Sequence, residues 1–157
     1  MPARRSAGLL VYRMREGAVE VFLVHPGGPF WARKDEGAWS VPKGEQMEDE
    51  EALVTAQREF AEETGMTVSG PYTPLAPVRQ AGGKIVQAFA VPGDFDATLI
   101  RSNTFTMEYP PRSGRLRTLP EVDRAGWFSL DAAAVKILAG QRPLLSELAS
   151  LIEGDKA

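Results

Sequence analysis

The stretch from Gly44 to Met66 reads GEQMEDEEALVTAQREFAEETGM, and it decides how the surrounding chain folds. Apolar side chains recur in it at three- and four-residue spacing: Leu53, Ala56 and Phe60. This period predicts an amphipathic helix over about residues 50–64. Asp49 is the predicted N-cap, and Gly65 is predicted to end the helix in the left-handed conformation.

Three carboxylates fall on one side of this helix, because residues three and four apart are neighbours on a helix surface. They are Glu59, Glu62 and Glu63. Like charges at this spacing repel, so the cluster predicts a counter-cation, and a hard divalent ion with oxygen ligands is the expected occupant. The pattern favours a Mg²⁺ site for phosphate chemistry over the alternative, an acidic helix face exposed to solvent.

The complete pattern resembles the Nudix box, the loop–helix–loop signature of the MutT-like Nudix hydrolase superfamily. Its fixed positions are Gly44, Glu50, Arg58, Glu59, Phe60, Glu62, Glu63, Gly65 and Met66. Every one of them matches in residue type and in spacing. The stretch Pro42-Lys43-Gly44 that leads into the box is similar to that of diadenosine tetraphosphate hydrolases, although other branches of the superfamily have it too.

The resemblance implies a metal-dependent pyrophosphohydrolase that uses Mg²⁺, with Mn²⁺ able to substitute. The implied metal ligands are Glu59, Glu62 and Glu63, with a backbone carbonyl near Gly44. The implied catalytic group is Glu59, Glu62 and Arg58, where Arg58 orients the loop and a glutamate. The general base is either Glu62 or Glu59, and Glu108 and Glu121 are more remote alternatives.

The implied substrate is a small phosphoanhydride, above all a dinucleoside polyphosphate or a (deoxy)nucleoside triphosphate. Lys43 is expected to contact a phosphate oxygen. Arg112 and Arg115, in a basic loop, are expected to hold the polyphosphate, since Arg binds phosphate in a bidentate way. An aromatic side chain near Trp39 would stack on a base. Phe30 and Trp31 are alternatives for that contact, and core packing is the alternative role for all three.

Other functions remain open from sequence alone. Diphosphoinositol polyphosphates, ADP-ribose and RNA 5′ ends are alternative substrates. A non-catalytic, nucleotide-sensing Nudix domain is a further alternative, although all motif glutamates are present. His25, the only histidine, is expected to be structural.

Composition limits the class of protein. The 157 residues predict a single domain over 1–157 with a sizeable core. A net charge of −3 argues against bulk nucleic-acid binding, and the absence of cysteine excludes disulfides and thiolate chemistry. No apolar run is long enough to span a membrane. A cytoplasmic monomer or homodimer is the expectation.

The predicted fold is an α/β/α sandwich with a mixed, curved β-sheet between helices, as the resemblance implies. Strands are expected at residues 6–14, 19–25, 39–44, 73–80, 84–91, 104–109 and 121–129, and helices at 131–138 and 143–152. Residues 110–117 are expected to form an irregular loop, because they are rich in Pro and Gly.

Overall fold

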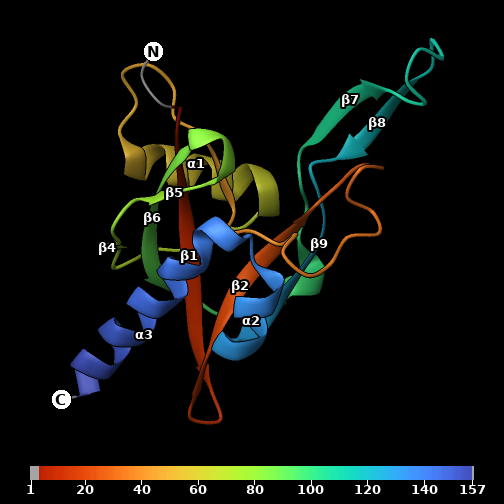
Figure 1. Ribbon diagram of the computed structural model, residues 1–157. Coiled ribbons are helices and arrows are strands. Elements are labelled where there is room, and N and C mark those ends of the chain that lie inside the picture. Colours follow the sequence, from red (N-terminus) through yellow and green to blue (C-terminus); the bar gives the residue numbers. More distant parts are fainter. Residues whose placement is uncertain (1–3, 157) are drawn as a thin grey trace.

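The computed structural model describes residues 4–156, which form a curved β-sheet between two helical layers (Figure 1). The strands are β1 Arg5–Arg15, β2 Ala18–Pro26, β3 Lys43–Glu45, β4 Thr73–Pro74, β5 Val78–Arg79, β6 Ile85–Pro92, β7 Thr104–Glu108, β8 Leu116–Pro120 and β9 Val122–Ser129. The helices are α1 Ala52–Thr64, α2 Leu130–Lys136 and α3 Arg142–Lys156, with 3₁₀ turns at Ala81–Gly83, Ala97–Leu99 and Ala139–Gln141.

Strands β1 and β2 form the predicted hairpin. Their antiparallel register runs from Tyr12 opposite Val21 to Arg15 opposite Ala18, so only Glu16 and Gly17 make the turn. Both turn residues have positive φ, 51° and 82°. Two left-handed residues give a turn whose twist matches that of the strands.

The main sheet is mixed, as predicted. Its strand order is β4-β6-β1-β2-β9, with β3 also pairing with β1 and β5 with β6. Only β1 and β6 run parallel; the other paired strands are antiparallel. Strand β1 therefore lies at the centre, where β2, β3 and β6 all bond to it.

Two hydrophobic cores cover the two faces of this sheet, which confirms the α/β/α arrangement. Leu10 and Val86 pack with Leu144 and Leu148 of α3 on one face. On the other face, strand residues pack with Ala56 and Phe60 of α1. Figure 1 shows α2 and α3 in front of the sheet and α1 behind it. No helix within residues 4–156 has the length and apolar character needed to cross a membrane.

The box helix begins later than predicted. Helix α1 starts at Ala52, with Glu51 at the N-cap position and no side-chain capping bond. Asp49 is therefore not the N-cap; its φ of 65° belongs to the preceding loop. The carboxylate of Glu50 closes that loop, because it accepts hydrogen bonds from Met47 N–H (3.2 Å) and Thr55 Oγ1 (2.7 Å).

The end of the helix is as predicted. Gly65 has a φ of 73°, and its N–H donates to the Ala61 carbonyl over 2.8 Å. A left-handed residue at this position is easiest for glycine, which has no Cβ to clash.

Two predicted strands are shorter than expected. Within 73–80, only β4 and β5 pair with β6. The pairing is interrupted between them because Ala76 N–H donates to Glu147 of α3 and Pro77 has no N–H. Within 39–44, Trp39 and Ser40 form isolated bridges to Ile137 and Val24, and regular pairing begins at Lys43.

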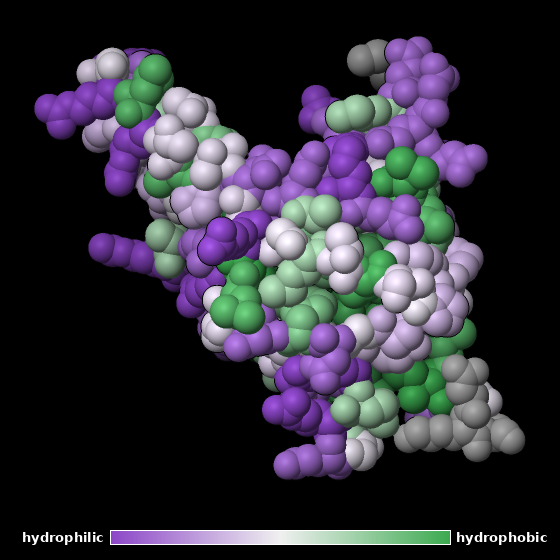
Figure 2. Space-filling view, turned by 180° about the vertical axis from the view of Figure 1, so that it is seen from behind, coloured by the Kyte–Doolittle hydropathy of each residue, from purple (hydrophilic) through white to green (hydrophobic). Residues whose placement is uncertain are grey.

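Strands β7 and β8 form a separate two-stranded sheet, with Phe105 opposite Leu119 and Met107 opposite Arg117. The predicted loop over 110–117 is therefore wrong at its end, since β8 already begins at Leu116. Cross-strand pairing with β7 overrides the local loop composition there. Figure 2 shows this hairpin standing clear of the body, with a notch between them whose floor is mainly hydrophilic.

Candidate active site

Strand β3 and helix α1 approach each other closely at Gly44. A Cβ built on Gly44 would lie 1.9 Å from Cδ of Glu59 and about as close to both carboxylate oxygens. No side chain fits in that space. Glycine at residue 44 therefore allows the Glu59 carboxylate to rest against the β3 backbone.

Glu63 has the most strongly perturbed carboxylate of the group. Burial above all, with the nearby negative charges of Glu59 and Glu121, raises its pKa to about 8 against the opposing effect of Lys43. The pKa of Glu59 is also raised, first by burial, against hydrogen bonding from Arg58. Carboxylates with raised pKa values in one cleft are typical of functional sites.

Arg58 positions two of the glutamates. Its Nε and Nη2 donate to the two oxygens of Glu50, each over 3.0 Å, and its Nη1 donates to Glu59 Oε1 over 3.0 Å. The hydrogen bonds from Arg58 hold the pKa of Glu50 near 2. Glu62 is the outer member of the cluster: its nearest oxygen is 3.4 Å from Nη1, and its side chain is 37% exposed.

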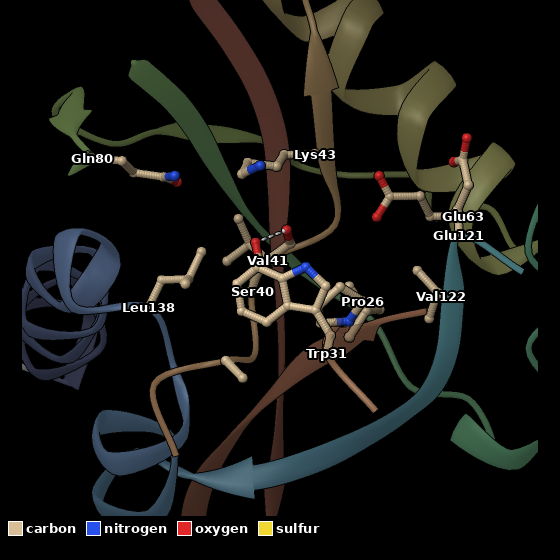
Figure 3. Close-up of a pocket in the computed structure, with 12 residues that line it drawn as sticks. Pro26, Trp31, Ser40, Val41, Lys43, Glu63, Gln80, Glu121, Val122 and Leu138 are labelled. Carbon is tan, nitrogen blue, oxygen red and sulfur yellow. Dashed lines mark hydrogen bonds between the residues drawn. The ribbon is translucent and has the colours of Figure 1, made fainter. Parts of the chain in front are cut away.

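A cavity of about 370 Å³ opens beside these carboxylates. Lys43, Glu63 and Glu121 form its charged part, and Ser40 and Gln80 are its neutral polar residues. The other lining side chains are mainly apolar: Val24, Pro26, Trp31, Ala38, Val41, Val122 and Leu138. Figure 3 shows Glu63 and Glu121 together on one side of the cavity and Gln80 and Leu138 on the other. This size and lining are those of a small-molecule site.

Lys43 is well placed for an anionic group. Burial lowers its pKa, and the positive charge of Lys84 lowers it further, whereas Glu63 and Glu59 raise it. Its side chain packs over Gly8, where a Cβ would lie 2.7 Å from the Lys43 Cβ. The cavity thus places a basic side chain within electrostatic range of Glu63 and Glu59.

The structure brings together Lys43, Gly44, Glu59 and Glu63, with Glu62 at their edge and Arg58 behind them. It does not bring Arg112 or Arg115 to the cavity wall, because both lie at the end of the β7–β8 hairpin.

The structure also shows where the predicted stacking residue Trp39 and the two remote base candidates, Glu108 and Glu121, lie. Trp39 lies in the core, 6% exposed, with its Nε1 donating to Asp35 and its ring 5.0 Å from that of Phe128. Among the remote candidates for a base, Glu121 lines the cavity, whereas the Glu108 carboxylate accepts the N–H of Arg112 in the hairpin loop.

Among the cavity residues, Gln80 was not assigned from the sequence, and Trp31 was given only as an alternative to Trp39 for stacking on a base. Gln80 has no local signal, since its partner Gln141 is 61 residues further along the chain.

His25 is buried and has a structural role, as predicted. Its Nδ1 lies 2.8 Å from Asp123 Oδ1, and its Nε2 lies 2.6 Å from the carbonyl oxygen of Lys34. Both ring nitrogens are therefore engaged in holding the loop after β2 to the start of β9.

The donor set fits a hard divalent cation. Among residues 4–156, no three acidic, histidine or cysteine side chains are already arranged around one ion position, and the Arg58 guanidinium lies against Glu59 and Glu62. However, the donors are all oxygen, which Mg²⁺ prefers. The absence of a side chain at Gly44 lets the Glu59 carboxylate lie against the β3 backbone. A cation would relieve the mutual repulsion of Glu59, Glu63 and Glu121.

Comparisons with known proteins show the family of this chain and proteins with a similar fold. Residues 2–148 match the family model of the NUDIX domain. Among solved structures, a C. elegans Ap4A hydrolase binary complex aligns with a TM-score of 0.65 at 22% identity, covering 95% of this chain and 98% of that chain. No curated protein sequence matches the chain significantly.

Two further solved structures have similar scores. A mutT/nudix family protein from Listeria innocua gives a TM-score of 0.64 at 19% identity, covering 99% and 97% of the two chains. The NUDIX domain of Shewanella oneidensis NrtR, complexed with ADP ribose, gives 0.63 at 16% identity, covering 96% and 88%. At these identities the likeness demonstrates a shared fold.

Proposed function

Because the chain belongs to the NUDIX domain family, we propose that it is a metal-dependent pyrophosphohydrolase that cleaves a phosphoanhydride bond in a nucleoside diphosphate-linked small molecule. One observation carries the proposal: Glu63 and Glu121 line the same cavity as Lys43, while Glu59 lies against Gly44, the next residue along the chain from Lys43. Carboxylates and a lysine at one end of a small-molecule cavity suit a polyphosphate. The sheet shared by both hydrophobic cores also supports a single domain.

The proposed metal ligands are Glu59, Glu62 and Glu63, with Glu121 close to them. Mg²⁺ is the proposed ion, with Mn²⁺ as a substitute; such an ion neutralises phosphate charge and lowers the pKa of water. Arg58 keeps Glu50 and Glu59 in place and is a positioning residue.

The remaining side chains bind substrate and accept a proton. Lys43 donates to a phosphate oxygen of the substrate. Glu59 and Glu62 stay candidates for the group that takes the proton from the attacking water. Glu121 joins them because it lines the cavity, whereas Glu108 lies in the projecting hairpin.

The proposed substrates are dinucleoside polyphosphates and (deoxy)nucleoside triphosphates. The Pro-Lys-Gly stretch and the similarity to an Ap4A hydrolase support the first class. ADP-ribose, capped or triphosphorylated RNA ends and diphosphoinositol polyphosphates are the alternatives to test, and the complex of a similar domain with ADP ribose makes ADP-ribose a necessary member of the panel.

A release assay tests this proposal. Phosphate, pyrophosphate and nucleotide products are measured over these compounds with Mg²⁺, with Mn²⁺ and with excess chelator. We expect turnover of at least one class with metal and none with chelator. Absence of turnover throughout the panel, with nucleotide still bound at saturating Mg²⁺, would replace the hydrolase with a nucleotide-binding domain.

A further inference from the structure

The apolar end of the cavity carries hydrogen-bond donors whose orientation a buried network fixes. The network starts at Gln141, which is fully buried. Its Oε1 accepts the backbone N–H of Val41 over 3.0 Å, so its amide has only one possible orientation. The Nε2 of Gln141 must then point the other way.

That Nε2 uses both of its hydrogens. One is donated to Ser40 Oγ over 3.0 Å and the other to Gln80 Oε1 over 2.7 Å. The oxygen of Gln80 is therefore directed at Gln141, and the Gln80 Nε2 becomes the free end of the amide. Gly140 keeps Gln80 in place, since a Cβ on Gly140 would lie 3.0 Å from the Gln80 Cα.

Gln80 and Trp31 both line the cavity. Within residues 4–156, neither Gln80 Nε2 nor Trp31 Nε1 donates a hydrogen bond to another residue. Lys34 Nζ lies over one face of the Trp31 indole, 4.9 Å from its centroid. Figure 3 shows the indole between Gln80 on one side and the two glutamates on the other. An aromatic ring and two N–H donors therefore lie on the side of the cavity away from the two glutamates, with Lys43 between Gln80 and Glu63.

We infer that this end of the cavity binds the nucleobase of the substrate and selects a keto base, guanine or uracil, over an amino base, adenine or cytosine. Both purines present N7 as an acceptor, so the difference lies at the neighbouring position. There guanine presents O6 and uracil O4 as acceptors, whereas adenine and cytosine present an amino group. An amino group of the base that faces the Gln80 Nε2 would place two hydrogen-bond donors against each other, with no acceptor for either. A buried donor without a partner is costly. This inference rests on the proposed function for the identity of the substrate.

Binding of nucleoside monophosphates without metal tests the inference separately from turnover. Dissociation constants for GMP and AMP are measured in chelator by titration calorimetry. We expect GMP to bind at least about 5-fold more tightly, the equivalent of one hydrogen bond. Equal affinities, within about 2-fold, would overturn the inference.

Gln80→Glu is the decisive variant, because one carboxylate oxygen still accepts from Gln141 while the other presents an acceptor to the cavity. The GMP/AMP preference should fall at least about 5-fold or reverse. GMP and AMP carry the same phosphate group, so the added negative charge should weaken the binding of both equally. Its effect therefore cancels in the ratio of their dissociation constants. Gln57→Glu, at an exposed position on α1, adds the same charge outside the cavity and should keep the wild-type ratio. The same ratio in both variants would overturn the inference.

Trp31→Phe provides a second measurement that does not disturb the Gln141 network. It keeps a stacking ring and removes the Nε1 donor, so the keto preference should weaken while both affinities stay measurable. An unchanged preference in both Trp31→Phe and Gln80→Glu contradicts the proposed site. Turnover of nucleotides with no base preference refutes the inference alone, and base preference without any turnover refutes the proposed function alone.

Discussion

Replacing Glu63 with Gln should stabilise the metal-free protein at alkaline pH. The pKa of Glu63 is raised by burial from 4.5 to about 8. Below pH 4.5, the folded and unfolded chains both hold the proton, so the residue has no pH-dependent effect. Between pH 4.5 and 8, the unfolded chain loses the proton and the folded chain keeps it, so stability falls as the pH rises.

The size of this effect follows from the interval between the two pKa values. Each pH unit corresponds to about 1.4 kcal/mol. Above pH 8, the free energy of unfolding of the wild-type protein should therefore be roughly 3–5 kcal/mol lower than at pH 4.5 because of Glu63. The neutral glutamine of the variant has no such effect. Below pH 4.5, the free energies of unfolding of the variant and the wild type should differ by a constant amount. Above pH 4.5, the difference should grow with pH.

Urea unfolding in chelator at pH 5, 6, 7 and 8.5 measures the difference. Glu51→Gln is the matched control, since Glu51 is exposed and its side chain makes no capping bond. The difference between Glu63→Gln and wild type should grow with pH, whereas that of Glu51→Gln should stay flat. A difference that is constant from pH 5 to 8.5 would refute the electrostatic reasoning about Glu63.

Three other predictions concern the same site. Mg²⁺ should raise the melting temperature more at pH 8 than at pH 5.5, because binding requires Glu63 to lose its proton; an equal rise at both pH values in thermal scans would contradict this. Gly44→Ala should cost about 1–3 kcal/mol in urea unfolding and should lower kcat, because its Cβ would overlap the Glu59 carboxylate; an unaffected variant would show that the close approach is unimportant. Arg58→Ala should lower kcat more than it changes KM, because it frees Glu50 and Glu59 without touching the cavity; a change confined to KM would place Arg58 on the substrate instead.

Local sequence patterns predicted the parts of the fold that local physics determines. The period of the apolar residues predicted helix α1, and Gly65 predicted where it ends. Two runs rich in β-forming residues, joined by a short turn that contains Gly17, predicted the central hairpin. Asp49 failed as the N-cap because the loop is closed by Glu50, whose carboxylate binds Thr55 and Arg58 rather than a free helix end.

The parts of the site that were missed depend on contacts between distant residues. Both Trp31 and Trp39 were candidates for stacking on a base, and contacts with residues distant in sequence, such as Phe128, place Trp39 in the core. The orientation of Gln80 depends on Gln141, and no local pattern connects them. The arginines of the hairpin loop were predicted at the site from their charge, but the pairing of β7 with β8 carries that loop away from the cavity.

The most direct test of the account compares the kcat of wild type, Glu63→Gln and Glu51→Gln at saturating Mg²⁺ on the best substrate from the release assay. Glu63→Gln should lose at least about 100-fold in kcat, because it removes a proposed ligand of the catalytic metal ion, while Glu51→Gln stays close to wild type. A Glu63→Gln protein that retains the full rate would contradict the claim that the carboxylates of this cavity support hydrolysis.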